Sequence, residues 1–182
     1  MKNAYAMMLL GAAAAGFAGS AIAAPTEATV AYTMANQRAA VDYKVARAKC
    51  NNFAGNLRAV CVAEARSARI HVEANAKAQY KSSLSARTDA REAIADADYD
   101  VDKARCVSKT GNAEEVCIKE AKAALVAAVA DAKADKKVIE ARADARDDKQ
   151  TADYKVALEK CDSLAGAAKD ACVMSARYQF DK

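Results

Sequence analysis

The sequence predicts an all-α fold, an elongated antiparallel helical bundle or coiled coil made of three disulfide-stapled helical hairpins. The first observation is composition, because the chain is rich in Ala, Lys, Arg, Glu and Asp, as long helices are. The second is the scarcity of helix breakers, since Pro25 is the single proline and only three glycines follow it. The third is a pattern of two cysteines around a glycine that occurs three times.

The first segment, residues 1–23, reads as a cleavable signal peptide. Lys2 gives a positive start, residues 6–18 are apolar but too short to span a bilayer, and Ala21-Ile22-Ala23 is an A-x-A cleavage signal. We expect cleavage after Ala23 and a protein of residues 24–182 that is periplasmic or secreted. No later apolar run is long enough for stable membrane insertion.

The rest of the chain is predicted to be a single Ala-rich helical repeat domain. Its repeat cores are residues 42–66, 98–122 and 153–177, which start 56 and then 55 residues apart. They share the pattern D-Y-x-V-x(4)-C-x(4)-G-x(5)-C-[VI]-x(2)-A-[RK] without gaps. Such regular self-similarity indicates that one supersecondary unit is used three times.

Each copy carries one glycine at its centre, and these glycines are predicted to form the hairpin turns. They are Gly55, Gly111 and Gly166. We expect each just past the end of a helix, where glycine adopts the left-handed conformation without a Cβ clash. Asn56 and Asn112 are expected to be the N-caps of the helices that follow.

The cysteines lie at equal distances from these turns, which predicts one disulfide within each copy. The predicted pairs are Cys50–Cys61, Cys106–Cys117 and Cys161–Cys172. Closing a loop of this size stabilises a hairpin by roughly 3 kcal/mol in the chain-entropy model. Metal or redox chemistry is the alternative, but zinc sites use cysteines two to four residues apart, and the lone His71 is far from every pair.

Between the turns no glycine or proline interrupts residues 56–110 or 112–165, so each is expected to be one helix of about 80 Å. Residues 27–54 and 167–181 are expected to be shorter helices. Folding at Gly111 would bring Gly55 and Gly166 to the same end, giving a rod four helices thick there and two at the other end.

Two junctions leave the continuity of these helices open. Residues 81–85, Lys-Ser-Ser-Leu-Ser, are a poor helix stretch, and Asp89 to Glu92 resembles a capping box. Residues 147–151 occupy a similar place in the next copy. The helices either continue through these points or kink there, and the alanine-rich segment 117–134 favours continuity.

A tyrosine precedes the first cysteine of each copy by seven residues and therefore shares its helix face. These residues are Tyr43, Tyr99 and Tyr154. Counted from the turns, Tyr43 should face Ala68, Tyr99 should face Ala124, and Tyr154 should face Gln179. We interpret them as packing residues and not as ligand-stacking residues.

The composition predicts no enzyme, no cofactor and no metal. There is one histidine and no tryptophan, and the carboxylates alternate with Lys and Arg in a way typical of solvated helix faces. Asp42, Asp98 and Asp153 precede the repeated tyrosines, but a duplicated unit repeats its structural residues too. The net charge, +4 or +3 without Lys2, is too balanced for nucleic-acid binding. Only weak membrane contact is expected, since the charges are mixed and the apolar face is mostly Ala.

The Y-x-V-x(4)-C-x(4)-G-x(5)-C repeats, with flanking stretches such as residues 121–148, resemble those of small exported proteobacterial Ala-rich proteins with C-x10-C helical repeats. Some of those proteins are labelled TolA-like or cell-envelope biogenesis proteins. The resemblance covers nearly all of residues 24–182, and it implies location and architecture but no functional residues.

These observations favour a non-enzymatic structural or interaction protein of the periplasm, with another envelope protein or a second copy of itself as partner. One alternative is an envelope stress protectant, or chaperone-like holdase, whose mobile helices shield client proteins. The other is a small-ligand or metal-binding helical module at the thick end of the rod.

Overall fold

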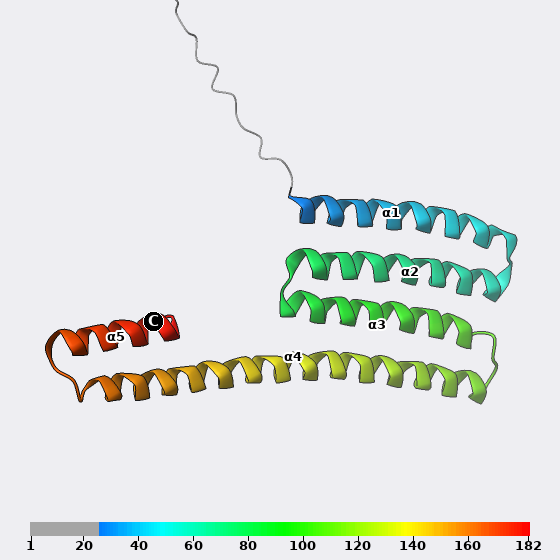
Figure 1. The fold of residues 1–182 in the computed structure, drawn as a ribbon. Helices are drawn as coiled ribbons and strands as arrows, with labels where there is room; N and C mark the ends of the chain where they lie inside the picture. The colour runs from blue at the N-terminus through cyan, green and yellow to red at the C-terminus, as the bar shows by residue number, and fades with distance from the viewer. Residues whose placement is uncertain (1–25) are drawn as a thin grey trace, which may run out of the picture.

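The computed structural model describes residues 26–182, and this part of the chain is helical with no strand. The elements are α1 (Glu27–Lys49), a 3₁₀ turn (Cys50–Asn52), α2 (Gly55–Lys81), α3 (Leu84–Cys106), α4 (Asn112–Cys161) and α5 (Gly166–Phe180) (Figure 1). The predicted all-α fold is therefore confirmed. The predicted signal peptide lies outside the described residues.

Three disulfides staple three hairpins, and their pairing is the predicted one. Cys50–Cys61 joins α1 to α2, Cys106–Cys117 joins α3 to α4, and Cys161–Cys172 joins α4 to α5. The Cα–Cα distances are 5.6, 5.6 and 5.7 Å. The first cysteine of each pair is among the most deeply buried side chains of the described chain. Three such bonds within one chain indicate an oxidising compartment outside the cytoplasm.

The turn glycines have the predicted left-handed φ, but they lie at the start of the second helix and not at the end of the first. Gly55, Gly111 and Gly166 have φ of 54°, 59° and 55°. The helices before them end earlier, close to the cysteines, so the residues between cysteine and glycine make the crossing. A Cβ at any of the three would meet nothing within 4 Å, so the backbone conformation, and not space, requires glycine.

The predicted asparagine N-caps are wrong. The N-cap positions of α2, α4 and α5 are Ala54, Gly111 and Ala165, and none supplies a side-chain cap. Asn56 lies inside the first turn of α2 instead. With its amide oriented to satisfy both neighbours, it donates to the carbonyl of Ala104 at 3.0 Å and accepts from the N–H of Ser108 at 3.2 Å.

The first long helix is broken, contrary to the prediction for residues 56–110. Ser82 ends α2 with a left-handed φ of 49°, and its N–H bonds the carbonyl of Ala78 at 3.0 Å. Ser83 is the N-cap of α3, accepting from the N–H of Ala86 at 3.1 Å. Two adjacent serines thus end one helix and begin the next. The capping-box sequence 89–92 lies within α3 and caps nothing.

The second long helix is continuous, as predicted. α4 runs for 50 residues, about 75 Å, and residues 147–151 do not interrupt it. Near its N-terminal half it pairs with α3, and near its C-terminal end with α5. Residues 140–149 lie between these contacts and are exposed apart from Ala143.

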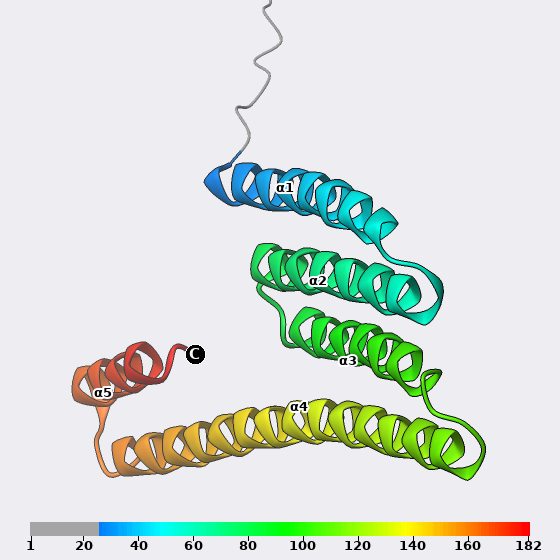
Figure 2. The ribbon, with the colours of Figure 1, turned by 90° about the vertical axis from the view of Figure 1, so that its right-hand side faces the viewer.

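The helices form a single layer in which each one packs only against its neighbours along the chain (Figures 1 and 2). α1, α2, α3 and α4 lie side by side at one end, and α4 and α5 at the other, so the molecule is a layer and not the predicted rod four helices thick (Figure 1). The reversal at Ser82 and Ser83 adds a turn, so the Gly55 and Gly111 turns share one end and Gly166 lies at the other (Figure 1). The prediction that Gly55 and Gly166 would share an end is therefore wrong.

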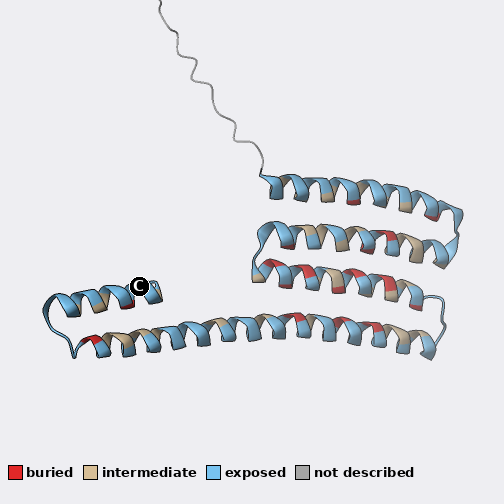
Figure 3. Ribbon diagram, viewed as in Figure 1, coloured by how far each residue is buried: buried red, intermediate tan, exposed pale blue. Residues whose placement is uncertain are grey.

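The core of this layer consists mostly of alanine. Buried positions follow the contact lines between helices and are densest on α3, which has a helix on each side (Figure 3). Val101 and Leu125 are the only buried aliphatic side chains larger than alanine among the described residues. Alanine lets the helices approach closely, but it leaves both broad faces of the layer uncovered.

Candidate functional site

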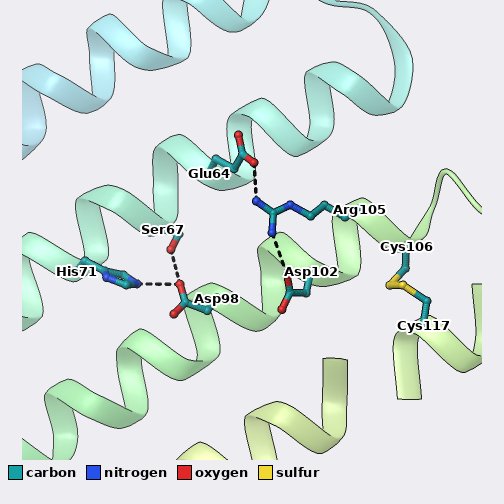
Figure 4. A network of polar contacts seen from close by, with 8 residues as sticks. All are labelled: Glu64, Ser67, His71, Asp98, Asp102, Arg105, Cys106 and Cys117. Carbon is teal, nitrogen blue, oxygen red and sulfur yellow. Dashed lines mark hydrogen bonds and ion pairs between the residues drawn. A yellow bond between two sulfur atoms is a disulfide. The ribbon is translucent and has the colours of Figure 1, made fainter. Parts of the chain in front are cut away.

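Polar side chains of α2 and α3 meet in a cluster that we call the α2–α3 polar network (Figure 4). Its members are Glu64, Ser67 and His71 on α2 and Asp98, Asp102 and Arg105 on α3. Together with Ala68 and Val101 they line an open depression between the two helices. This network contains the one histidine of the chain, and it is therefore the main candidate for acid–base or nucleophilic catalysis.

Serine, histidine and aspartate come together here, but not in the order that nucleophilic catalysis needs. The Ser67 hydroxyl donates to Oδ1 of Asp98 at 2.8 Å, and Nε2 of His71 contacts the same oxygen at 2.7 Å. In a catalytic triad the imidazole lies between hydroxyl and carboxylate, so that it can take the hydroxyl proton. Here the carboxylate lies between them, and it holds α2 and α3 together.

Arg105 makes the second contact between these helices. Its guanidinium bonds Glu64 across the interface at 2.8 Å and Asp102 on its own helix at 3.2 Å. The hydrogen bond that Arg105 donates to Glu64 is the main cause that raises the pKa of Arg105 above its ordinary value. All three side chains are about half exposed, so solvent screens these ion pairs and each contributes little to stability.

The repeated tyrosines each reach across their own hairpin, where they are half-buried. Tyr43 lies under the guanidinium of Arg69 at 5.6 Å, Tyr99 lies under the ammonium of Lys122 at 5.2 Å, and Tyr154 packs on Phe180 with ring centroids 5.9 Å apart. These partners are one or two positions from the predicted Ala68, Ala124 and Gln179. Each tyrosine thus joins the two helices of its own hairpin, with a cation in the first two copies and an aromatic ring in the third.

The three aspartates that precede these tyrosines differ in their surroundings. Asp98 bonds to the neighbouring α2, as described above. Asp42 pairs only with Arg38 on its own helix, at 3.9 Å and exposed, and Asp153 lines a shallow groove between α4 and α5. Sequence reasoning missed the roles of Ser67 and His71, because their contact with Asp98 depends on the reversal at Ser82.

An apolar depression lies on one face of α1, α2 and α3. It has a volume of about 640 Å³, and its lining includes Tyr32, Ile70 and Ala90 with charged groups of both signs, such as Arg69 and Glu73. At one end Tyr32 stacks on Tyr80 with ring centroids 4.9 Å apart. Such a surface has the chemistry to accept an amphipathic segment of another protein, and sequence reasoning could not place it without knowing the layer.

Metal sites, membrane-spanning helices and free cysteines are absent from residues 26–182. Over residues 26–182, no three side chains of His, Cys, Asp or Glu lie close enough together to hold a metal ion. No helix in that range is both long and apolar enough to cross a membrane. All six cysteines are in disulfides.

Comparisons of the chain with protein-family models, with curated proteins and with solved structures give no match.

Proposed function

We propose that this chain is a non-enzymatic structural or interaction protein of the bacterial cell envelope, working in the periplasm. The observation that carries the proposal is the stapled single layer of helices with uncovered faces. The three disulfides hold the helices side by side in an open layer and do not close them around a core. Such an arrangement supports binding on an extended surface better than binding in an enclosed pocket. The polar network is consistent with this role, because its contacts hold α2 against α3.

The exposed faces carry charges of both signs and scattered apolar side chains. α4 adds a segment, residues 140–149, that bridges the two ends of the molecule without a neighbouring helix and contains seven charged residues. Mixed charge and modest apolar content suit a reversible contact with another protein. A bridging helix of this length also suits a spacer, because it fixes the separation of what binds at its two ends.

The test is site-specific photo-crosslinking in the periplasm of the producing cell. A photoreactive residue is placed at Lys77 on the α1–α3 face, at Arg142 on the bridging segment, and at Met174 on α5 as a comparison position. We expect adducts of defined mass whose yield depends on position and falls when unlabelled protein is added in excess. Exported, oxidised protein that gives no position-dependent adduct at Lys77 or Arg142 would contradict the proposal.

The second candidate is a holdase, and exposed apolar side chains favour it. Seventeen large apolar residues of the described chain are exposed, among them Leu57, Met174 and Tyr178. Such side chains could shield unfolding clients transiently. Purified oxidised protein should then suppress the thermal aggregation of an unrelated client in proportion to its concentration. No suppression at tenfold molar excess would exclude this role.

A further inference from the structure

The outer edge of the layer is formed by α1, and this edge carries a stripe of exposed apolar side chains. The stripe consists of Val30, Met34, Val41 and Val45, which are between 42% and 63% exposed. At about 100° per residue they fall within an arc of roughly 60°. The opposite side of the helix carries Ala39 and Cys50, which are buried against α2. The most apolar side of the free edge therefore points away from the molecule.

The same positions are buried in the next repeat. Fifty-six residues later they are Ala86, Ala90, Ala97 and Val101, and these are only 4% to 6% exposed. They lie on the side of α3 that packs on α2, since Ala86 and Ala90 share a depression with Ile70 and Ala74, and Val101 shares one with Ser67. The stripe on α1 is thus the surface with which this repeat packs on a preceding helix, and among residues 26–182 no helix precedes α1.

The surface that receives the stripe is also repeated. α2 receives α3 with the side that carries Asn56, Glu64, Ser67 and His71. Fifty-six residues later these positions are Asn112, Glu120, Ala123 and Ala127 on α4, and all four are exposed. At about 100° per residue they lie opposite the buried Ala121, Leu125 and Ala132, which face α3. No described element covers that outer side of α4 (Figures 1 and 2).

We propose that α1 of one molecule packs on the N-terminal half of α4 of a second copy of this chain, in the arrangement that α3 and α2 adopt within the molecule. The layer then continues from copy to copy. This inference rests on the proposed interaction role and names a partner for it. Because the two edges differ, the contact is heterologous and leaves a free edge at each end, so association proceeds beyond the dimer.

The sizes of the side chains fit this pairing, and one ion pair is retained. The stripe on α1 has larger side chains than its counterpart on α3, and α4 offers Ala123 and Ala127 where α2 has Ser67 and His71, so large residues meet small ones. The ion pair of Glu64 with Arg105 is replaced by Glu120 with Lys49.

One pair is unfavourable. Arg66 and Asp100, 4.0 Å apart across the α2–α3 contact, are replaced by Lys122 and Lys44. Two lysines at this place weaken the association, so it requires a higher protein concentration. They also provide a substitution that should strengthen it.

The experiment is sedimentation velocity of the oxidised protein of residues 24–182 over a concentration series. Wild type should show a weight-average mass that rises with concentration beyond that of a dimer. Val41→Asp on the α1 edge and Ala127→Arg on the α4 edge should each abolish the rise, whereas Met174→Lys on α5 should leave it unchanged. All these positions are exposed, and circular dichroism checks that each variant is folded.

Two further measurements separate this pairing from others. A mixture of Val41→Asp with Ala127→Arg should form a one-to-one dimer and nothing larger, since each variant retains one intact edge. Lys44→Asp should shift the rise to about fivefold lower concentration, because it replaces a like-charged pair with an ion pair.

A wild-type protein that stays monomeric would overturn the proposal. So would association that survives Ala127→Arg, which would place α1 against another α1. Loss with Ala127→Arg but not with Val41→Asp would also overturn it, because α4 would then pair with a second α4. None of these outcomes bears on the photo-crosslinks at Lys77 and Arg142, so the two proposals fail separately.

Discussion

Ser82 and Val138 occupy the same position of two repeats, each 21 residues after the second cysteine, yet the chain reverses at one and runs straight through the other. Ser82 has a left-handed φ of 49° and ends α2, whereas Val138 lies within α4. The difference is local. Serine tolerates the left-handed conformation better than a β-branched residue, and Ser83 can cap the next helix, which Ile139 cannot.

The reversal therefore depends on two side chains that can be exchanged. We predict that Ser83→Ala lowers the free energy of unfolding by about 1 kcal/mol through loss of the cap, and that Ser82→Val lowers it by about 1–2 kcal/mol through left-handed strain. Urea denaturation followed by circular dichroism measures both. Ser85→Ala is the matched control, because Ser85 is exposed in the first turn of α3 but is not its cap, and the change should alter stability by less than about 0.5 kcal/mol. Equal effects at positions 83 and 85 would contradict the assigned cap.

Asp98 should matter to stability although Asp42, its counterpart in the first repeat, should not. Asp98→Ala leaves the buried hydroxyl of Ser67 without its acceptor, and we expect it to lower the free energy of unfolding by about 1–3 kcal/mol. Asp42→Ala removes only an exposed pair with Arg38 and should cost less than about 1 kcal/mol. Urea denaturation of both variants at neutral pH makes the comparison, and indistinguishable midpoints would refute the structural role given to the network.

The third disulfide should be needed for α5 to fold. α5 has 15 residues and contacts only α4, and a helix of that length is marginal on its own. We predict that the double variant Cys161→Ala, Cys172→Ala loses hydrogen-exchange protection throughout α5 while α1, α2 and α3 keep theirs. Cys106→Ala with Cys117→Ala is the control.

That control removes a disulfide that closes a loop of the same length between α3 and α4. These helices also pack on each other where Ala121, Leu125 and Ala132 of α4 are buried, so they should stay protected although global stability falls by about 3 kcal/mol. Protection retained in α5 without its disulfide would show that Tyr154 and Phe180 suffice to hold it.

The stacked pair of Tyr32 and Tyr80 should hold the first helix in place. The rings lie 4.9 Å apart and join the N-terminal part of α1 to the C-terminal part of α2. We expect Tyr32→Ala to lower the free energy of unfolding by about 1–3 kcal/mol and to raise exchange near the start of α1. Tyr178→Ala is the comparison, since Tyr178 is 92% exposed and should be nearly neutral.

The hairpins could be predicted from sequence because their signals are covalent or conformational. A disulfide at fixed spacing and a glycine with left-handed φ act locally, and three copies of the pattern exclude coincidence. The sequence did not predict that each glycine begins the second helix. That position depends on the residue at which the preceding helix ends, and helix ends cannot be predicted from sequence to within one or two residues.

The sequence pattern could not predict which of the two long helical segments reverses and which continues. Ala86, Ala90 and Val101 pack on α2, and 55 residues later Ala141, Ala145 and Val156 repeat the same stripe on the unbroken part of α4. The face pattern therefore allows a fold-back in both repeats. Differences of about 1–2 kcal/mol at Ser82 and Ser83 decide between the two outcomes, and composition does not resolve differences of that size. The polar network follows from that reversal, which is why His71 looked isolated in the sequence.

Because each helix packs only on its neighbours along the chain, every contact of the molecule is closed over a short stretch of backbone. Chains with such low contact order fold quickly, and repeat-like arrays can start folding at any unit. The cysteines follow the same logic. Each native partner is 11 residues away, while the nearest foreign cysteine is about four times as far, a difference of roughly 1 kcal/mol in loop-closure entropy. Oxidation in order of proximity thus favours the native pairing before the fold is complete.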